Sequence, residues 1–385
     1  MEEDQDHHPI SLGLSKIEIG IVAIAAIIYI ILRITSVESI PAVVAILGFI
    51  VALWSIMRPT EWAVEGLGML AQRLGIGTYA AGVIGSIMAN LPELILAALL
   101  ILNGQKDLAI LTVLIVAGAN TLLFGVITIR SSRKNGGSVR VPVTTLRYET
   151  ELMIVAFITS IFLFVFNFAE QIIWLSRENQ ARDHVSIPVI FAVGTVIIYL
   201  SYLYFLANDK ELNPPLTEER KEAIEEDPGL AKRNIAKFLL FGIIGIVIAG
   251  ELLANGAELL IGVAESSGAH FNEAYIALIV AGLGSIPEWA IAFKAEEDLD
   301  LVFGSVLSSI SATLLFMIGL VSIFMYFFVE GGFRLDPYGM VQILLSGSIL
   351  LFVNLLMKDD HKLDAFEGVC IVILQLIGFD ILISI

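Results

Sequence analysis

The sequence predicts an all-α polytopic membrane protein with about eleven transmembrane helices. Of its 385 residues, 57% are hydrophobic, and the mean hydropathy is +0.87. Many apolar runs reach about 18 residues or more, which is the length that a helix needs to cross the hydrocarbon core of a bilayer. Two of these runs are interrupted by a proline that is followed directly by glutamate. This composition excludes a water-soluble core.

The expected spans follow the apolar runs along the chain. They lie near residues 17–35, 40–74, 76–102, 108–129, 150–168, 187–206, 235–265, 274–294, 301–328, 339–357 and 363–384. The tail before the first span is acidic and lacks the basic leader and small-residue cleavage site of a signal peptide, so we expect this span to be retained. Cys370 is the only cysteine, which excludes a disulfide framework and a cysteine metal site.

Lysine and arginine predict the topology. Residues 130–147 and 210–233 are rich in both, and both segments lie on the cytoplasmic side if the amino terminus does. We therefore expect a cytoplasmic amino terminus, in what we take to be a prokaryotic cell membrane because the chain is compact and carries no sorting signal. The net charge of −17 and the lack of a basic cluster interleaved with aromatic residues argue against nucleic acid as a partner. The expected partners are membrane lipid and transported cations.

Three pieces of the chain recur in the same order and at similar spacing. Residues 60–75 align with 253–268, the two proline-glutamate motifs follow about 195 residues apart, and 112–120 align with 305–313. Because five spans separate equivalent points, the two copies must cross the membrane in opposite directions. This is the inverted-repeat architecture of secondary transporters.

The predicted organisation has four parts. Residues 1–37 form a tail and an extra helix, 38–206 the first five-helix repeat, 207–234 an acidic cytoplasmic linker, and 235–385 the second repeat. In this arrangement an ion site is expected at mid-membrane between the two repeats.

The proline-glutamate motifs predict where that site lies. They read Ala89-Asn90-Leu91-Pro92-Glu93 and Gly284-Ser285-Ile286-Pro287-Glu288. A carboxylate at membrane depth is costly and usually faces a partner, a cavity or an ion pathway. Proline has no N–H, so it also leaves a carbonyl without its helical donor close to the glutamate. Carboxylates together with amide, hydroxyl and carbonyl oxygens suit Ca²⁺, which accepts six to eight mixed oxygen ligands.

At these residues the chain resembles the calcium/cation antiporter superfamily, which includes sodium/calcium and proton/calcium exchangers. The two motifs resemble the G-T-S-L-P-E copies of the sodium/calcium branch, and the first resembles G-N-x-x-E of the proton/calcium branch equally well. A second family motif, G-S-x-x-x-N, is degraded: Val116 replaces the first serine, and Thr313 replaces the second asparagine. A shift by one residue would pair Thr121 with Thr313 instead. The departures favour protons over sodium as the counter-ion.

The predicted site combines these residues. Glu93 and Glu288 are the expected direct ligands of the cation. The remaining candidates supply amide, hydroxyl or main-chain oxygens and are Asn90, Ser285, Asn120, Ser309, Thr313, Ala89 and Gly284. For Asn120, Ser309 and Thr313 an interhelical hydrogen-bonding role is the alternative. Gln375 and Asp380, near the carboxyl end, are expected at the membrane interface.

The expected function is secondary antiport of Ca²⁺ against H⁺ or Na⁺, with no cofactor beyond the transported ions. When Ca²⁺ leaves, two facing carboxylates in a low dielectric must take up another cation, which couples the two fluxes. The alternatives are a passive divalent-cation channel and an antiporter for Mg²⁺, Mn²⁺ or K⁺. An enzyme is not expected, since no histidine lies at membrane depth and no H-E-x-x-H motif is present. The oligomeric state is left open.

Overall fold

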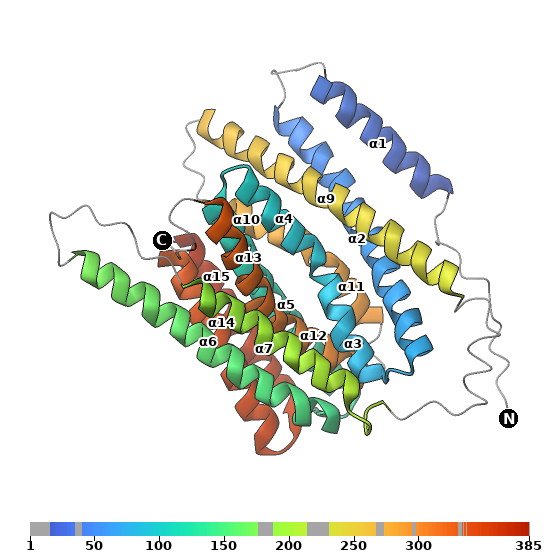
Figure 1. Ribbon diagram of the computed structural model, residues 1–385, viewed down its shortest axis with the longest axis vertical. Helices are drawn as coiled ribbons and strands as arrows, with labels where there is room; N and C mark the ends of the chain where they lie inside the picture. The colour runs from blue at the N-terminus through green and yellow to red at the C-terminus, as the bar shows by residue number, and fades with distance from the viewer. Residues whose placement is uncertain are drawn as a thin grey trace.

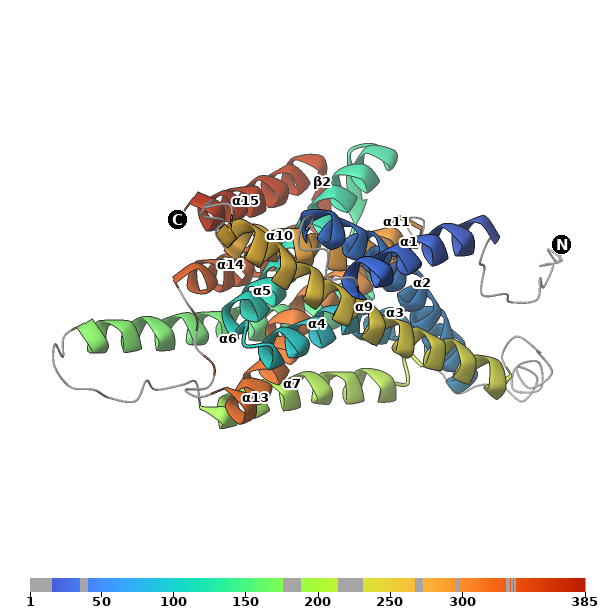
Figure 2. The same ribbon diagram turned by 90° about the horizontal axis from the view of Figure 1, so that it is seen from above.

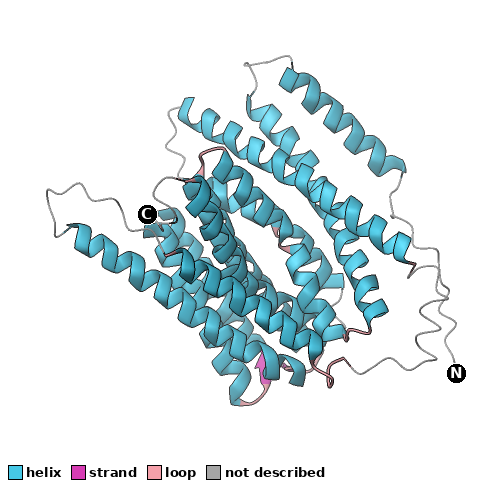
Figure 3. Cartoon of the chain, in the orientation of Figure 1, coloured by secondary structure: helices cyan, strands magenta, loops and turns pink. Residues whose placement is uncertain are grey.

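The structure is a computed structural model that describes residues 16–34, 41–175, 188–213, 231–266, 273–294, 298–329, 333, 335 and 337–384. The amino-terminal tail and most of the expected acidic linker lie outside these residues. The described chain is almost entirely helical, with one pair of short strands (Figure 3).

The helices of the first part of the chain are α1 Lys16–Ile34, α2 Pro41–Leu74, α3 Thr78–Ala89, α4 Leu91–Leu102, α5 Lys106–Lys134, α6 Val143–Leu175 and α7 Val189–Asn208. Those of the second part are α9 Lys232–Ser266, α10 Glu273–Gly284, α11 Ile286–Lys294, α12 Leu299–Ala312, α13 Ile318–Phe328, α14 Pro337–Asp359 and α15 Ala365–Ser384. A π-helical segment, η1 Thr313–Met317, joins α12 to α13. The strands are β1 Ser138–Arg140 and β2 Lys362–Asp364.

Each predicted span coincides with one helix or with a pair of consecutive helices. Eight continuous helical stretches among the described residues are long and apolar enough to cross a membrane. The fold class is thus confirmed as an all-α integral membrane protein, while the count of eleven spans stays a prediction.

The two proline-glutamate motifs sit at helix breaks of the same design. Pro92 and Pro287 are each the second residue of a new helix, where a missing N–H is tolerated because that donor has no intrahelical partner. At the first joint the Asn90 N–H donates to the Ser86 carbonyl at 3.0 Å, and at the second the Ser285 N–H donates to the Ala281 carbonyl at 2.9 Å. Each span is therefore interrupted without being separated into two unconnected helices.

Helix packing repeats between the two halves. Helix α3 packs on α12 as α10 packs on α5, α4 packs on α9 as α11 packs on α2, and α7 packs on α13 as α15 packs on α5. This reciprocity relates α2–α7 to α9–α15, as two inverted repeats require, while the boundaries of the repeats and the count of five spans in each stay predictions. In Figures 1 and 2, α1, α2 and α9 lie on one side of the molecule and α6, α7, α14 and α15 on the other, with the broken helices between them.

Contacts between distant loops agree with opposite orientations of the repeats. Strand β1, after α5, pairs antiparallel with β2, before α15, so that Arg140 lies opposite Lys362. Toward the other end of α6, the Leu335 N–H donates to Asn167 Oδ1 at 3.1 Å. Each contact joins segments separated by an even number of predicted spans, as two points on one side of a membrane must be. Which side is cytoplasmic stays a prediction.

Helices α2 and α9, of 34 and 35 residues, cross in close contact at glycine positions. A Cβ added at Gly245 would lie 2.2 Å from Pro59 Cγ, and one at Gly242 would lie 2.7 Å from Ala63 Cβ. The crossing therefore depends on the absence of these side chains.

Two expectations were wrong. The span predicted from residue 150 belongs to a helix that begins at Val143, and this extension buries Glu149 completely. The polar string Arg147 to Glu151 resembles a loop in composition, but its side chains divide between an exposed and a buried face of the helix. Gln375, expected at the interface, is also fully buried, because α15 packs this face on α5 and α14.

Candidate ion site

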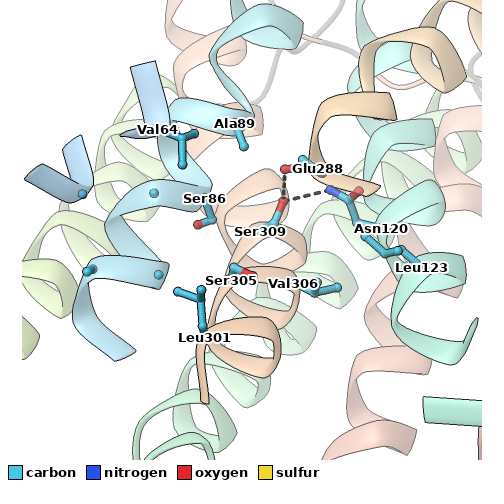
Figure 4. A pocket seen from close by; sticks show the side chains of 14 residues that line it. Val64, Ser86, Ala89, Asn120, Leu123, Glu288, Leu301, Ser305, Val306 and Ser309 are labelled. Atoms are coloured by element: carbon cyan, nitrogen blue, oxygen red, sulfur yellow. Dashed lines mark hydrogen bonds between the residues drawn. The ribbon is translucent and has the colours of Figure 1, made fainter. Parts of the chain in front are cut away.

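The hydroxyl of Ser309 on α12 joins residues from both halves. It accepts hydrogen bonds from Asn90 Nδ2 and Asn120 Nδ2, each at 2.8 Å, and donates to Glu288 Oε1 at 2.7 Å. Figure 4 shows Ser309 between Glu288 and Asn120, with both hydrogen bonds drawn. The Ser309 hydroxyl has one donor and two acceptor positions, and these three bonds use all of them. Ser309 therefore orients three other side chains.

Glu93 lies on the other broken helix and is 1% exposed. Neither of its carboxylate oxygens has a hydrogen-bond partner in the structure. Its carboxylate lies against the second helix break, since a Cβ built on Gly284 would be 2.9 Å from Glu93 Oε1. Gly284 precedes Glu288 by four residues, so the Glu93 carboxylate lies beside the helix break that carries the second glutamate. The two carboxylates thus come from facing helix breaks.

Several oxygens of this cluster are buried and have no hydrogen-bond partner. They are both carboxylate oxygens of Glu93, Oε2 of Glu288, Oδ1 of Asn90 and Oδ1 of Asn120. Buried acceptors without donors are unfavourable, and two carboxylates more so. No ion pair to Glu93 or Glu288 occurs among the described residues. Such a set of oxygens favours a cation as the missing partner.

A cavity of about 210 Å³ opens beside this cluster. Its polar lining comes from Ser86, Asn120, Glu288, Ser305 and Ser309, and the rest is mainly small or aliphatic residues of α2, α3 and α12. In Figure 4, Ser86 and Ala89 on one wall face Glu288 and Ser309 on the other. This volume accommodates a hydrated or partly hydrated ion. Because Glu288 lines the cavity, such an ion could reach its carboxylate from there.

The remaining sequence-predicted residues lie near the cluster but use their side chains differently. The Ser285 hydroxyl donates to the Ala281 carbonyl at 2.9 Å, and the Thr313 hydroxyl donates to the Ser309 carbonyl at 2.9 Å. Both bonds stay within the residue's own helical segment. Ala89 lines the cavity, and Gly284 contacts Glu93 through its missing side chain.

The π-helical segment after Ser309 bears on the alignment of the repeats. Gly125 lies against the Gly368 carbonyl and Val372, just as Gly319 lies against the Ala192 carbonyl and Val196. These contacts make Gly125 equivalent to Gly319, which follows it by 194 residues. Asn120 and Thr313 are 193 residues apart, so the offset between the repeats grows by one residue across this segment. A π turn inserts one residue into a helix, so the register favours Asn120 with Thr313 over Thr121 with Thr313.

Three glutamates of the long helices α2 and α9 are not part of this buried cluster. Glu65, Glu251 and Glu258 are exposed, and Asn255 donates to Glu251 Oε1 at 3.0 Å. The described residues contain no group of three or more His, Cys, Asp or Glu arranged to hold a metal ion. The ion site therefore has to use amide, hydroxyl and carbonyl oxygens beside its two glutamates.

Comparisons with known proteins agree with this architecture. The family model described as "Sodium/calcium exchanger protein" matches residues 44–208 and 237–377. The crystal structure of an H⁺/Ca²⁺ exchanger, CAX, is similar with a TM-score of 0.67 at 16% identity, covering 97% of this chain and 93% of that one. A structure of the sodium-calcium exchanger NCX_Mj, soaked with Na⁺ and Sr²⁺, gives a TM-score of 0.59 at 18% identity and covers 87% and 97%.

A comparison with curated protein sequences found no match. The two structural likenesses, both below one-fifth identity, show the fold. The family match is stronger, because it covers most of both halves and includes both helix breaks. The chain therefore belongs to the sodium/calcium exchanger family and is a secondary cation transporter, not an enzyme.

Proposed function

We propose that the protein exchanges Ca²⁺ for protons across a membrane and that Glu93 and Glu288 bind the two ions alternately. The observation that carries this proposal is the pair of buried carboxylates with no cationic partner at facing helix breaks. Together they match the charge of one divalent ion. The free amide oxygens of Asn90 and Asn120 add neutral ligands of the kind that Ca²⁺ accepts.

Coupling follows from electrostatics. Two ionised carboxylates in a buried site repel each other and lack solvation, so release of Ca²⁺ leaves a state that must bind another cation before it is stable. Protons satisfy two carboxylates without further ligands. The site therefore crosses the membrane either with Ca²⁺ or with the exchanged ion, and seldom empty.

Sodium is the alternative counter-ion. Sodium sites need several oxygens each, and the second family motif provides few of them here. Val116 offers no oxygen, and the Thr313 hydroxyl is directed to its own helix. Asn120 and Ser309 remain, but both bind Glu288 or each other. This scarcity of additional oxygens favours protons.

Alternating access would use the crossed helices α2 and α9. They contact the broken helices through α4 and α11, and α2 supplies Val64 and Gly68 to the cavity wall. Movement of this pair relative to α5 and α12 would open one end of the site while closing the other.

The test is radioactive Ca²⁺ uptake into liposomes that contain the purified protein, driven by an outward proton gradient or an outward sodium gradient. We expect proton-driven uptake that Glu93→Gln and Glu288→Gln abolish. Glu151→Gln, which changes an exposed carboxylate on α6, is the matched control and should leave uptake unchanged. Uptake driven only by the sodium gradient would show that the counter-ion is Na⁺ and not H⁺. Ca²⁺ flux that needs neither gradient would refute antiport.

A further inference from the structure

A second buried carboxylate lies outside the ion site. Glu149, on the second turn of α6, is 0% exposed. Its Oε1 accepts hydrogen bonds from the hydroxyls of Tyr202 at 2.8 Å and Tyr79 at 3.0 Å. Its Oε2 is buried and has no partner in the structure. Both donors therefore use the same oxygen and leave the other one bare.

No cation compensates this carboxylate among the described residues. On its own helix, Arg147 is half exposed and pairs with Glu211 and Asp209. The Tyr148 hydroxyl donates to Asp209, and this hydrogen bond holds the pKa of the half-buried Asp209 carboxyl below its usual range. The basic side chain on this turn of α6 is thus directed to other acids and away from Glu149.

The helices packed on this part of α6 present polar or acidic groups instead. Helix α3 contributes Tyr79, and α7 contributes Tyr199 and Tyr202. Helix α12 contributes Ser308 and the carboxylate of Asp300, which receives a hydrogen bond from Thr144. Helix α14 contributes the Asn354 amide, which donates to the Thr150 carbonyl at 2.6 Å, with Lys358 exposed one turn further on. An ionised Glu149 held by two hydroxyls alone is unfavourable, whereas a proton on Oε2 neutralises it.

The position of Glu149 connects one surface to the ion site. Just before it in α6, which is separated from β1 by two residues, the side chains of Thr144, Arg147 and Tyr148 bond to acids that are exposed or half-buried. In the other direction, the Tyr202 ring lies beside that of Tyr199, with centroids 6.1 Å apart and the ring planes tilted by 40°. The Tyr199 hydroxyl lies 3.5 Å from Ser308 Oγ. Ser308 precedes Ser309, the residue that holds Glu288.

We propose that Glu149 is a second proton-binding carboxyl of the transporter, which takes up and releases a proton at Oε2 during the transport cycle and lies between the β1–β2 end and the ion site. The step is a simple protonation, with the proton supplied by or returned to water at that end. The inference rests on the proposed proton exchange for its role in transport, but the protonation itself does not.

Infrared difference spectroscopy tests the protonation in the full-length protein in lipid nanodiscs, titrated with pH in the absence of Ca²⁺. A Glu93→Gln/Glu288→Gln background removes the carbonyl stretch of the ion-site carboxyls. Surface carboxyls also titrate, so the relevant signal is the carbonyl band of a buried carboxyl. We expect such a band to disappear in Glu149→Gln and to remain in Glu151→Gln, which changes the exposed face of the same helix. A spectrum that Glu149→Gln leaves unchanged would overturn the proposal. A Glu149 signal that remains that of an ionised carboxylate at every pH would overturn it as well.

The pH profile of Ca²⁺ uptake tests the role in transport, with wild-type ion-site glutamates. Tyr79→Phe or Tyr202→Phe each remove one donor to the carboxylate and should move the uptake midpoint upward by about one pH unit, or tenfold in proton concentration. Glu149→Gln should eliminate this sensitivity. A uniform loss of flux at all pH values, or an unshifted midpoint in the tyrosine variants, would mean a structural role. If no gradient drives uptake even in the wild type, the proposed function fails while the infrared result still stands.

Discussion

The contact between Gly284 and Glu93 provides the sharpest test of the ion site. In Gly284→Ala the new Cβ would lie 2.9 Å from Glu93 Oε1, 3.3 Å from its Cγ and 3.5 Å from its Cδ. Ordinary contacts begin near 3.4 Å. The carboxylate must therefore retreat by about 0.5 Å, and it has little room because Glu93 is surrounded by the packed core.

This displacement is large for a metal ligand. Ca²⁺ binds oxygen at 2.3–2.6 Å, and workable sites keep their distances within about 0.2 Å. We expect Ca²⁺ affinity to fall about 10- to 100-fold, which corresponds to about 1.4–2.8 kcal/mol. Isothermal titration calorimetry on the purified protein measures this directly.

Gly282→Ala is the matched control, because it lies on the same helix and an added Cβ meets no atom within 4 Å. It should bind Ca²⁺ like the wild type. Equal affinities of Gly284→Ala and Gly282→Ala would mean that Glu93 does not ligate the ion from this position. Loss in both would instead indicate a general effect on α10.

Three further predictions concern the Ser309 hydroxyl, the crossing of α2 and α9, and the membrane topology. Ser309→Ala removes three hydrogen bonds and should weaken the apparent Ca²⁺ affinity in uptake assays about 10- to 100-fold, while the exposed Ser348→Ala has no effect. Gly245→Ala inserts a methyl group against Pro59 and should lower stability in thermal unfolding by about 1–3 kcal/mol, whereas Gly262→Ala, with open space around it, should not. Arg140→Cys/Lys362→Cys, with the native cysteine replaced, should form a disulfide under mild oxidation, since directly opposed strand residues lie within bridging distance. Failure to crosslink would contradict the placement of both loops on one side.

The broken helices were predictable because their cause is local. Proline removes a backbone donor wherever it occurs, and a glutamate beside it in an apolar run requires an explanation at once. The spans and the repeat were predictable for a similar reason, since length and periodic order do not depend on tertiary contacts. The resemblance of the motifs to a known family then pointed to the function class.

The arrangement inside the site was not predictable in the same way. That Ser309 would bind Asn90, Asn120 and Glu288 together depends on how α12 meets α3, α5 and α11 in space. Sequence spacing placed Thr313 beside these residues, but its hydroxyl is held by its own helix. The π turn that begins at Thr313 left no recognisable signal, because its residues are as apolar as their neighbours.

Glu149 was missed for a reason that recurs at membrane interfaces. The mean composition of residues 147–151 combines the exposed Arg147 and Glu151 with the buried Glu149, so the segment resembles a loop. A helical projection would have placed Glu149 two residues away from each of them, on another face. Polar residues at the end of an apolar run should therefore be assigned by face before they are assigned to solvent.

The two halves share a fold but differ where chemistry is concerned. Ala89 corresponds to Gly284, and at Gly284 the missing side chain lets the Glu93 carboxylate of the other half approach the backbone. Val116 corresponds to Ser309, so the hydroxyl that binds Asn90, Asn120 and Glu288 comes from the second half alone. A symmetric scaffold would present the same access and the same charge to both sides of the membrane. These substitutions make the two halves unequal at the level of single side chains, and a transporter that binds cations on one side of the membrane and releases them on the other can use such an inequality.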